Sequence, residues 1–126
     1  MSERQPIALV VDDQPLVRMD AADIITAAGY DVLEAADAEE ALFYLKEYPS
    51  IRLLFTDIQM PEIDGLSLVW HVKANWPHVR VIVTSGAMVP GEDELPKEAR
   101  FIAKPFSPKL IVDTIREISG LPAENR

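Results

Sequence analysis

The sequence of 126 residues contains no cysteine, and this absence excludes several kinds of site. A disulfide framework, a thiolate metal centre and a cysteine nucleophile all require that residue. Long apolar runs are also lacking, because the longest are the size of a strand and fall well short of the ~18 residues that span a bilayer. The first six residues are polar and no apolar signal-peptide core follows them, so a cytoplasmic protein is expected.

Basic residues are scarce relative to acidic ones. The chain has 12 Lys and Arg against 21 Asp and Glu, which gives a formal net charge of −9. A nucleic-acid-binding protein normally presents a basic face that neutralises phosphates. We therefore expect no direct nucleic-acid or membrane partner, and any effect on transcription would pass through another protein. An acidic balance also suits a site for a divalent cation.

The residues that are present indicate one globular domain. Hydrophobic residues make up 48% of the chain and charged residues 26%, which are ordinary values for a soluble fold. We expect a single domain over 1–126 with its core at about 6–120. Apolar segments the size of strands alternate with amphipathic segments the size of helices, and the predicted strands are 7–11, 30–36, 51–56, 79–84 and 100–103. The first is apolar at successive positions, which is typical of a parallel strand buried on both faces.

Helix signals fill the intervals between these strands. Pro15 lies in the first turn of the first helix, where its missing N–H costs little. Asp37 and Glu40 have the spacing of a capping box at the start of the second helix. Ser107 is the predicted N-cap of the last helix. The segment 87–96 carries two prolines and one glycine, so it predicts a fourth helix that is short or irregular.

Five alternating β-α units predict an α/β fold, (βα)5, with an open, doubly wound parallel sheet. In such sheets ligands bind beyond the carboxyl ends of the strands. The residues at the carboxyl ends of the strands and directly after them are therefore the candidates for function: Asp12, Asp13, Asp57, Thr84, Ser85, Gly86, Lys104 and Pro105.

Three carboxylates at one edge of a sheet repel one another. Either a strongly raised pKa on one of them or a hard cation among their oxygens would relieve that repulsion. Mg²⁺ fits, because it is typically held by one or two carboxylates, waters and a phosphate. A lysine and a hydroxyl nearby would complete a cradle for a phosphoryl group. Each signal alone is weak, since an Asp pair after a strand is more often a turn or a helix cap.

Four motifs in order give the sequence a family resemblance. They are Val10–Asp13, Leu54–Pro61 followed by Asp64-Gly65, Val81–Gly86, and Lys104–Phe106. Together they resemble the receiver domain of two-component response regulators, over roughly 6–120. The resemblance implies a flavodoxin-like fold with strand order 2-1-3-4-5.

The resemblance also implies roles for individual residues. Asp57 matches the phosphoacceptor of the family. The direct metal ligands match Asp13, Asp57 and the backbone carbonyl of Gln59, and Asp12 matches the acid that reaches the metal through water. The implied metal is Mg²⁺, with Mn²⁺ able to substitute. Lys104 matches the lysine that pairs with the phosphoryl group.

A conformational switch is implied as well. Thr84 matches the hydroxyl that moves to the phosphoryl oxygen, and Phe101 matches the aromatic residue that turns inward on activation. The peptide bond before Pro105 is commonly cis in the family. The surface that changes is implied to comprise the fourth helix, the fifth strand and the fifth helix, here 87–96, 100–103 and the segment after Ser107.

The resemblance implies two kinds of partner and leaves alternatives open. The donor would be a sensor histidine kinase or a histidine phosphotransfer protein, and a downstream protein would read the switched surface. The chain would be a monomer or a weak, phosphorylation-dependent homodimer. It would be a signalling phosphoacceptor rather than an enzyme, limited to self-phosphorylation and self-dephosphorylation.

Three other interpretations compete with a stand-alone switch. The sequence also suits a relay or sink receiver cut from a hybrid kinase. A hydrolase that forms an aspartyl-phosphate is disfavoured, because the second position after Asp57 is Gln59 and offers no general acid. A pseudo-receiver that only binds is disfavoured by the complete set of Asp12, Asp13, Asp57, Thr84 and Lys104.

Overall fold

The computed structural model describes residues 5–60 and 64–119; Pro61 of the third-strand motif and Gly120, the predicted end of the core, lie outside them. The described residues form one five-stranded sheet in the order β2-β1-β3-β4-β5, with all neighbours parallel. The strands are β1 Ile7–Val11, β2 Asp31–Ala35, β3 Ile51–Asp57, β4 Arg80–Ser85 and β5 Arg100–Ala103. The predicted fold class and strand order are confirmed.

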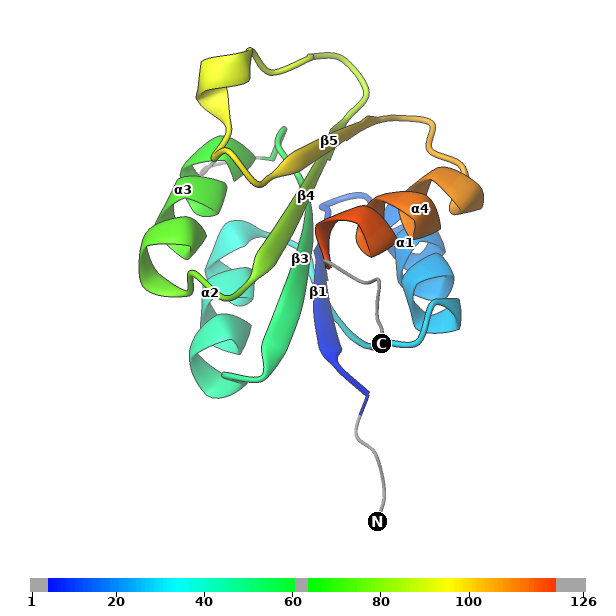
Figure 1. Ribbon diagram of the computed structural model, residues 1–126, viewed down its shortest axis with the longest axis vertical. Helices are drawn as coiled ribbons and strands as arrows, with labels where there is room; N and C mark the ends of the chain where they lie inside the picture. Colours follow the sequence, from blue (N-terminus) through cyan, green and yellow to red (C-terminus); the bar gives the residue numbers. More distant parts are fainter. Residues whose placement is uncertain (1–4, 61–63, 120–126) are drawn as a thin grey trace.

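Helices cover both faces of the sheet (Figure 1). They are α1 Pro15–Ala27, α2 Ala38–Glu47, α3 Gly65–Asn75 and α4 Pro108–Ile118. One buried apolar cluster joins the sheet to α2 and α3, and a second joins it to α1 and α4. Burial of apolar surface on both faces explains why β1 is apolar at every position and why β3 and β4 each contain three consecutive apolar residues, 53–55 and 81–83.

The helix starts follow the predicted caps, with one difference. The hydroxyl of Ser107 accepts the N–H of Leu110 at 3.1 Å, and the carboxylate of Asp37 accepts the N–H of Glu40 at 2.8 Å. The carboxylate of Glu40 returns to the N–H of Ala36 at 2.8 Å instead of that of Asp37. The capping interaction therefore reaches one residue further back than in a standard capping box.

The predicted fourth helix is reduced to a single 3₁₀ turn, η1 Glu92–Glu94. Pro90 precedes this turn and Pro96 follows it, and both lack the N–H that a longer helix would need. The last predicted helix is consequently α4.

Two side chains from one face of α3 hold the η1 region. Trp70 donates its indole N–H to the carbonyl of Glu94 at 2.8 Å. One turn later, the ammonium of Lys73 pairs with the carboxylate of Glu98 at 2.7 Å. The chain between β4 and β5 thus gains side-chain contacts with α3 where it forms little helix of its own.

Two strands extend further than predicted at their carboxyl ends, where the candidate functional residues lie. β3 continues to Asp57 and β4 continues to Ser85, so both residues belong to strands instead of following them. None of the helices in the described ranges is both long and apolar enough to span a membrane.

Candidate functional site

The carboxyl ends of β1 and β3 bring three acidic side chains together. The two strands are neighbours, with Val11 paired to Thr56, so Asp12 and Asp57 follow that pair directly. Carboxylate oxygens of Asp12, Asp13 and Asp57 all lie within 4.8 Å of one another. Asp12 and Asp57 are buried, whereas Asp13 is exposed.

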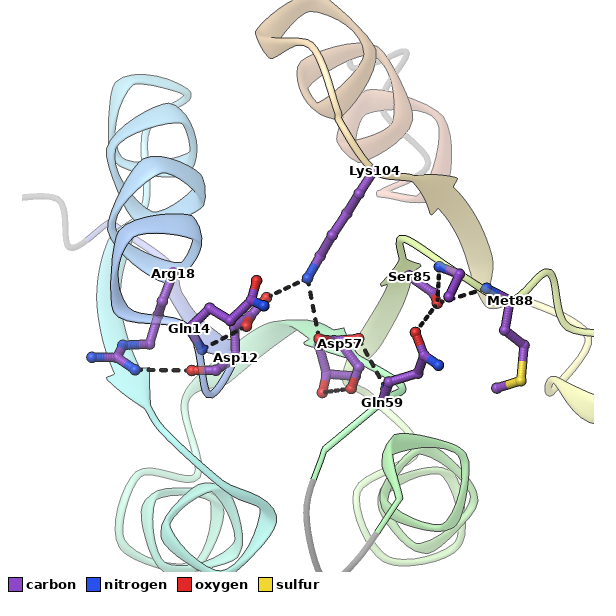
Figure 2. A network of polar contacts seen from close by, with 10 residues as sticks. Asp12, Gln14, Arg18, Asp57, Gln59, Ser85, Met88 and Lys104 are labelled. Carbon is purple, nitrogen blue, oxygen red and sulfur yellow. Dashed lines mark hydrogen bonds and ion pairs between the residues drawn. The ribbon is translucent and has the colours of Figure 1, made fainter.

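Lys104 extends from the end of β5 between two of these carboxylates (Figure 2). Its ammonium lies 2.9 Å from Oδ2 of Asp12 and 3.1 Å from Oδ2 of Asp57. Burial lowers the pKa of Lys104, but hydrogen bonds to Asp12 and Asp57 and the charges of both carboxylates outweigh it, so the pKa lies above its usual value. Lys104 therefore stays charged at neutral pH and balances part of the acidic cluster.

Backbone N–H groups fix the orientation of both buried carboxylates. Oδ1 of Asp57 accepts the N–H of Gln59 at 2.9 Å, and Oδ1 of Asp12 accepts the N–H of Gln14 at 2.9 Å. In each case Oδ1 is occupied by the chain two residues on, as in an Asx turn. The other oxygen, Oδ2, is left facing Lys104.

Thr84 contributes a buried hydroxyl beside Asp57. The two residues are paired across β3 and β4, and Thr84 has no exposed surface. Its Oγ1 has no hydrogen-bond partner among residues 5–60 and 64–119. A buried hydroxyl without a partner costs about 1–3 kcal/mol, so a ligand oxygen placed within its reach would gain from the contact.

The hydroxyl of Ser85, unlike that of Thr84, is fully engaged in hydrogen bonds. Its hydroxyl donates to Oε1 of Gln59 at 2.8 Å and accepts the N–H groups of Ala87 and Met88 at 3.3 and 3.2 Å. Ser85 thus caps the turn after β4 and holds the side chain of Gln59 across the mouth of the site (Figure 2).

The end of β5 places the remaining predicted residues. The peptide bond between Lys104 and Pro105 is cis, and the N–H of Lys104 donates to the carbonyl of Ser85 at 3.0 Å. Phe101, paired with Val83, is half-buried and packs against the apolar cluster under α2 and α3.

Two residues that support the site had no role assigned from the sequence. Gly65 begins α3 so close to β3 that a Cβ there would overlap the backbone of Asp57 and Ile58. Arg18 on α1 donates to the backbone carbonyl of Asp12 at 2.8 Å and pairs with Glu34 at 3.0 Å. A glycine at a helix start is a weak sign of close approach, but nothing in the sequence marks Arg18.

The donor set is one that a hard divalent cation accepts. It consists of carboxylate oxygens and contains no soft ligand. The exposure of Asp13 leaves one side of the cluster open to water. The acidic residues could therefore hold a metal ion such as Mg²⁺.

A comparison with protein families decides the identity of the fold. The model of the response regulator receiver domain matches residues 8–116. This chain belongs to the receiver domain family.

Individual relatives agree with this assignment. The receiver is 36% identical to the chemotaxis protein CheY of Thermotoga maritima, over 88% of this chain and 95% of the relative. It is 34% identical to the sensor kinase CckA of Brucella abortus over 87% of this chain, which corresponds to only 12% of that kinase. It also spans about half, 49%, of the probable transcriptional regulator ycf27 of Porphyra purpurea, at 30% identity.

Solved structures of receiver domains also resemble this chain. The crystal structure of the receiver domain from hybrid histidine kinase CckA shares 34% identity, with a TM-score of 0.77 over 89% of this chain and 97% of that one. A response regulator receiver protein from Sinorhizobium medicae superposes with a TM-score of 0.86 at 20% identity, over 95% and 98% of the two chains, and supports the fold alone. The chain is thus a phosphoryl-accepting receiver of two-component signalling, and its acidic pocket fits that role.

Proposed function

We propose that Asp57 is the phosphoacceptor and that Asp12, Asp13, Thr84 and Lys104 serve the transfer to it. The observation that carries this proposal is the position of Asp57: its carboxylate is buried, lies 3.1 Å from the ammonium of Lys104 and has an oxygen within 4.8 Å of carboxylate oxygens of Asp12 and Asp13. Asp57 is also paired across β3 and β4 with Thr84, whose hydroxyl has no partner among the described residues.

The transfer requires one oxygen of Asp57 to act as a nucleophile. We assign Oδ2, because Oδ1 is bonded to the N–H of Gln59 and Oδ2 faces Lys104. As the new oxygen–phosphorus bond forms, the nitrogen–phosphorus bond of a phosphohistidine breaks, and its electron pair leaves on the imidazole, which takes up a proton. The partners would be a sensor histidine kinase or a histidine phosphotransfer protein.

The residues around Asp57 then neutralise and orient the phosphoryl group. Lys104 already bridges two carboxylates and is placed to pair with a phosphoryl oxygen once one is present on Asp57. Asp12, Asp13 and Asp57, with the carbonyl of Gln59, would hold Mg²⁺ or Mn²⁺. The bound metal supplies positive charge for the equatorial oxygens of the transferring group.

The switch would begin at Thr84. A phosphoryl oxygen gives its hydroxyl the partner that the described residues do not provide. We propose that Phe101 turns inward after Thr84 has moved, because Phe101 is half-buried on β5, the strand beside the one that carries Thr84. The changed surface would comprise the segment 87–96 that contains η1, together with β5 and α4. Val89 in that segment and Leu110 on α4 are exposed apolar residues that a downstream protein can contact.

Labelling with acetyl phosphate tests the assignment. The protein should gain the mass of one phosphoryl group in the presence of Mg²⁺, and gain nothing in EDTA or in the variant Asp57→Asn. Asp20→Asn, a change of equal charge on α1, is the matched control and should be labelled like the parent. Retention of the label by Asp57→Asn would refute the role of Asp57.

An aspartyl-phosphate hydrolase is the second candidate, and the position of Gln59 speaks against it. The side chain of Gln59 is bonded to Ser85 and is an amide, so it cannot protonate a leaving alcohol. We therefore propose a signalling phosphoacceptor whose only turnover is loss of its own phosphoryl group. Steady turnover of 4-nitrophenyl phosphate by the parent, abolished in Asp57→Asn, would favour the hydrolase.

A further inference from the structure

A second polar cluster lies at the opposite edge of the sheet, where the strands begin. A cleft of about 900 Å³ opens there, lined by the ends of α1 and α4 and the starts of β3 and β4. Arg52, Arg80 and Arg116 all line it, together with His78 and Tyr30. Arg52 precedes Asp57 by five residues on β3, which at ~3.3 Å per residue places the cleft about 16 Å from the phosphoacceptor. This is the lower edge of the sheet in Figure 1.

The three arginines differ from the other two in the described ranges. Arg18 pairs with Glu34 at 3.0 Å and Arg100 pairs with Glu117 at 3.5 Å. Within residues 5–60 and 64–119, the cleft arginines have no carboxylate oxygen within 4.0 Å. In a chain of net charge −9, positive charge without ion pairs is thus gathered in one concave place.

A backbone irregularity brings Arg52 into this cluster. Ile7 pairs with Ile51 but Ala8 pairs with Leu53, so Arg52 is an extra residue in β3. Ile51 packs in the cluster under α2 and α3, whereas Leu53 packs in the cluster under α1 and α4. The bulge therefore turns the strand so that Arg52 reaches the same side as Arg80, as bulges commonly re-aim a side chain.

Negative charge near the cleft offsets this cluster only in part. Asp23 is the one acidic residue among those that line it. The helices α1 and α4 also end there, and each helix end is equivalent to about half a negative charge. The pKa of Glu98 is lowered, mainly by Lys73 and to a smaller extent by the charge of Arg80. Asp23 and the two helix ends together supply about two negative charges, and Glu98 is already paired with Lys73, so the three guanidinium groups exceed the remaining negative charge.

We infer that this cleft binds a small phosphorylated ligand of the nucleotide class. Guanidinium groups match phosphate oxygens with two parallel hydrogen bonds each, and several of them together suit more than one phosphate. A free phosphate would leave most of the cleft unused, because ligand sites of ~300–1,000 Å³ take a whole small molecule. The cleft is also lined by the apolar side chains of Ile24, Val112 and Ile115 and by Tyr30, a lining that suits a flat base.

Calorimetric titration with ADP in EDTA, without Mg²⁺, tests the inference. We expect saturable binding with a dissociation constant below about 1 mM, and at least tenfold weaker binding of adenosine and of inorganic phosphate. The variants Arg80→Gln and Arg116→Gln should each lose at least tenfold in affinity. Arg100→Gln, which removes an equal charge outside the cleft, should stay within twofold.

Amide chemical shifts locate the ligand and separate this inference from the phosphoacceptor assignment. Addition of ADP should move the signals of Tyr30, Arg80 and Ser119, and Arg80→Gln should still accept phosphate from acetyl phosphate. The inference is overturned by shifts centred on Lys104, by inorganic phosphate binding as tightly as ADP, or by an equal loss in Arg100→Gln. Binding of an oligoglutamate peptide at these residues without binding of ADP would also overturn it.

Discussion

Thr84 and Thr56 are buried threonines that differ in one respect. The hydroxyl of Thr56 donates to the carbonyl of Asp57 at 2.9 Å, whereas that of Thr84 has no partner among the described residues. We expect Thr84→Val to raise the free energy of unfolding by about 1 kcal/mol, because it removes an unsatisfied hydroxyl, and Thr56→Val to lower it by about 1 kcal/mol. Urea unfolding of the unphosphorylated protein measures both. A loss of stability in Thr84→Val would show that its hydroxyl is already bonded.

Lys104 stabilises two buried carboxylates. Its removal should leave them to repel each other without a neutralising cation. In Lys104→Met, Asp12 and Asp57 remain buried at 3% and 5% exposure without their cation. We expect the free energy of unfolding in EDTA to fall by about 3 kcal/mol. Saturating Mg²⁺ should recover most of that loss, since Lys104 is not a ligand.

Lys109→Met is the matched control for this experiment. Lys109 pairs with Asp113 at 2.7 Å on the exposed face of α4, where an ion pair contributes little. The free energy of unfolding of this variant should stay close to that of the parent and should respond to Mg²⁺ as the parent does. Loss of Mg²⁺ binding in Lys104→Met would contradict the proposal that Lys104 pairs with the phosphoryl group and takes no part in the metal site.

At the scale of elements, the closest approach is that of α3 to β3. A methyl group at Gly65 would overlap the backbone of Asp57 and Ile58, so α3 would have to shift away from the strand that carries Asp57. We expect Gly65→Ala to lower the free energy of unfolding by about 1–3 kcal/mol and to slow labelling by acetyl phosphate. Gly91→Ala is the control, because a Cβ there meets only the side chain of Glu94, no closer than 3.7 Å. Equal stability of the two variants would contradict this account.

The whole molecule should be coupled to its metal. A ligand that binds only the folded state stabilises it by about 2.7 kcal/mol at one hundred times its dissociation constant. We therefore expect saturating Mg²⁺ to raise the melting temperature of the parent. Asp13→Ala should melt no lower than the parent in EDTA, because Asp13 is exposed and its removal relieves repulsion within the cluster, but should respond little to Mg²⁺. A full response of this variant would remove Asp13 from the proposed ligand set.

Much of this protein follows from its sequence alone. The apolar segments of β1, β3 and β4 can be satisfied only by burial on both faces, which dictates a parallel sheet between helices. Once the sheet is parallel, Asp12, Asp57 and Lys104 must share one edge, and the family motifs assign the strand order. Pro90 and Pro96 likewise predicted that little helix would form between β4 and β5.

Tertiary structure decided what depends on contact between distant segments. The bond from Ser85 to Gln59, the bridge of Lys104 and the unpartnered hydroxyl of Thr84 are set by distances across strands, which local sequence does not encode. The arginine cleft is the clearest case. Alternation along β3 would send Arg52 and Leu53 to opposite faces, and only the register shift against β1 brings Arg52 beside Arg80 and Arg116.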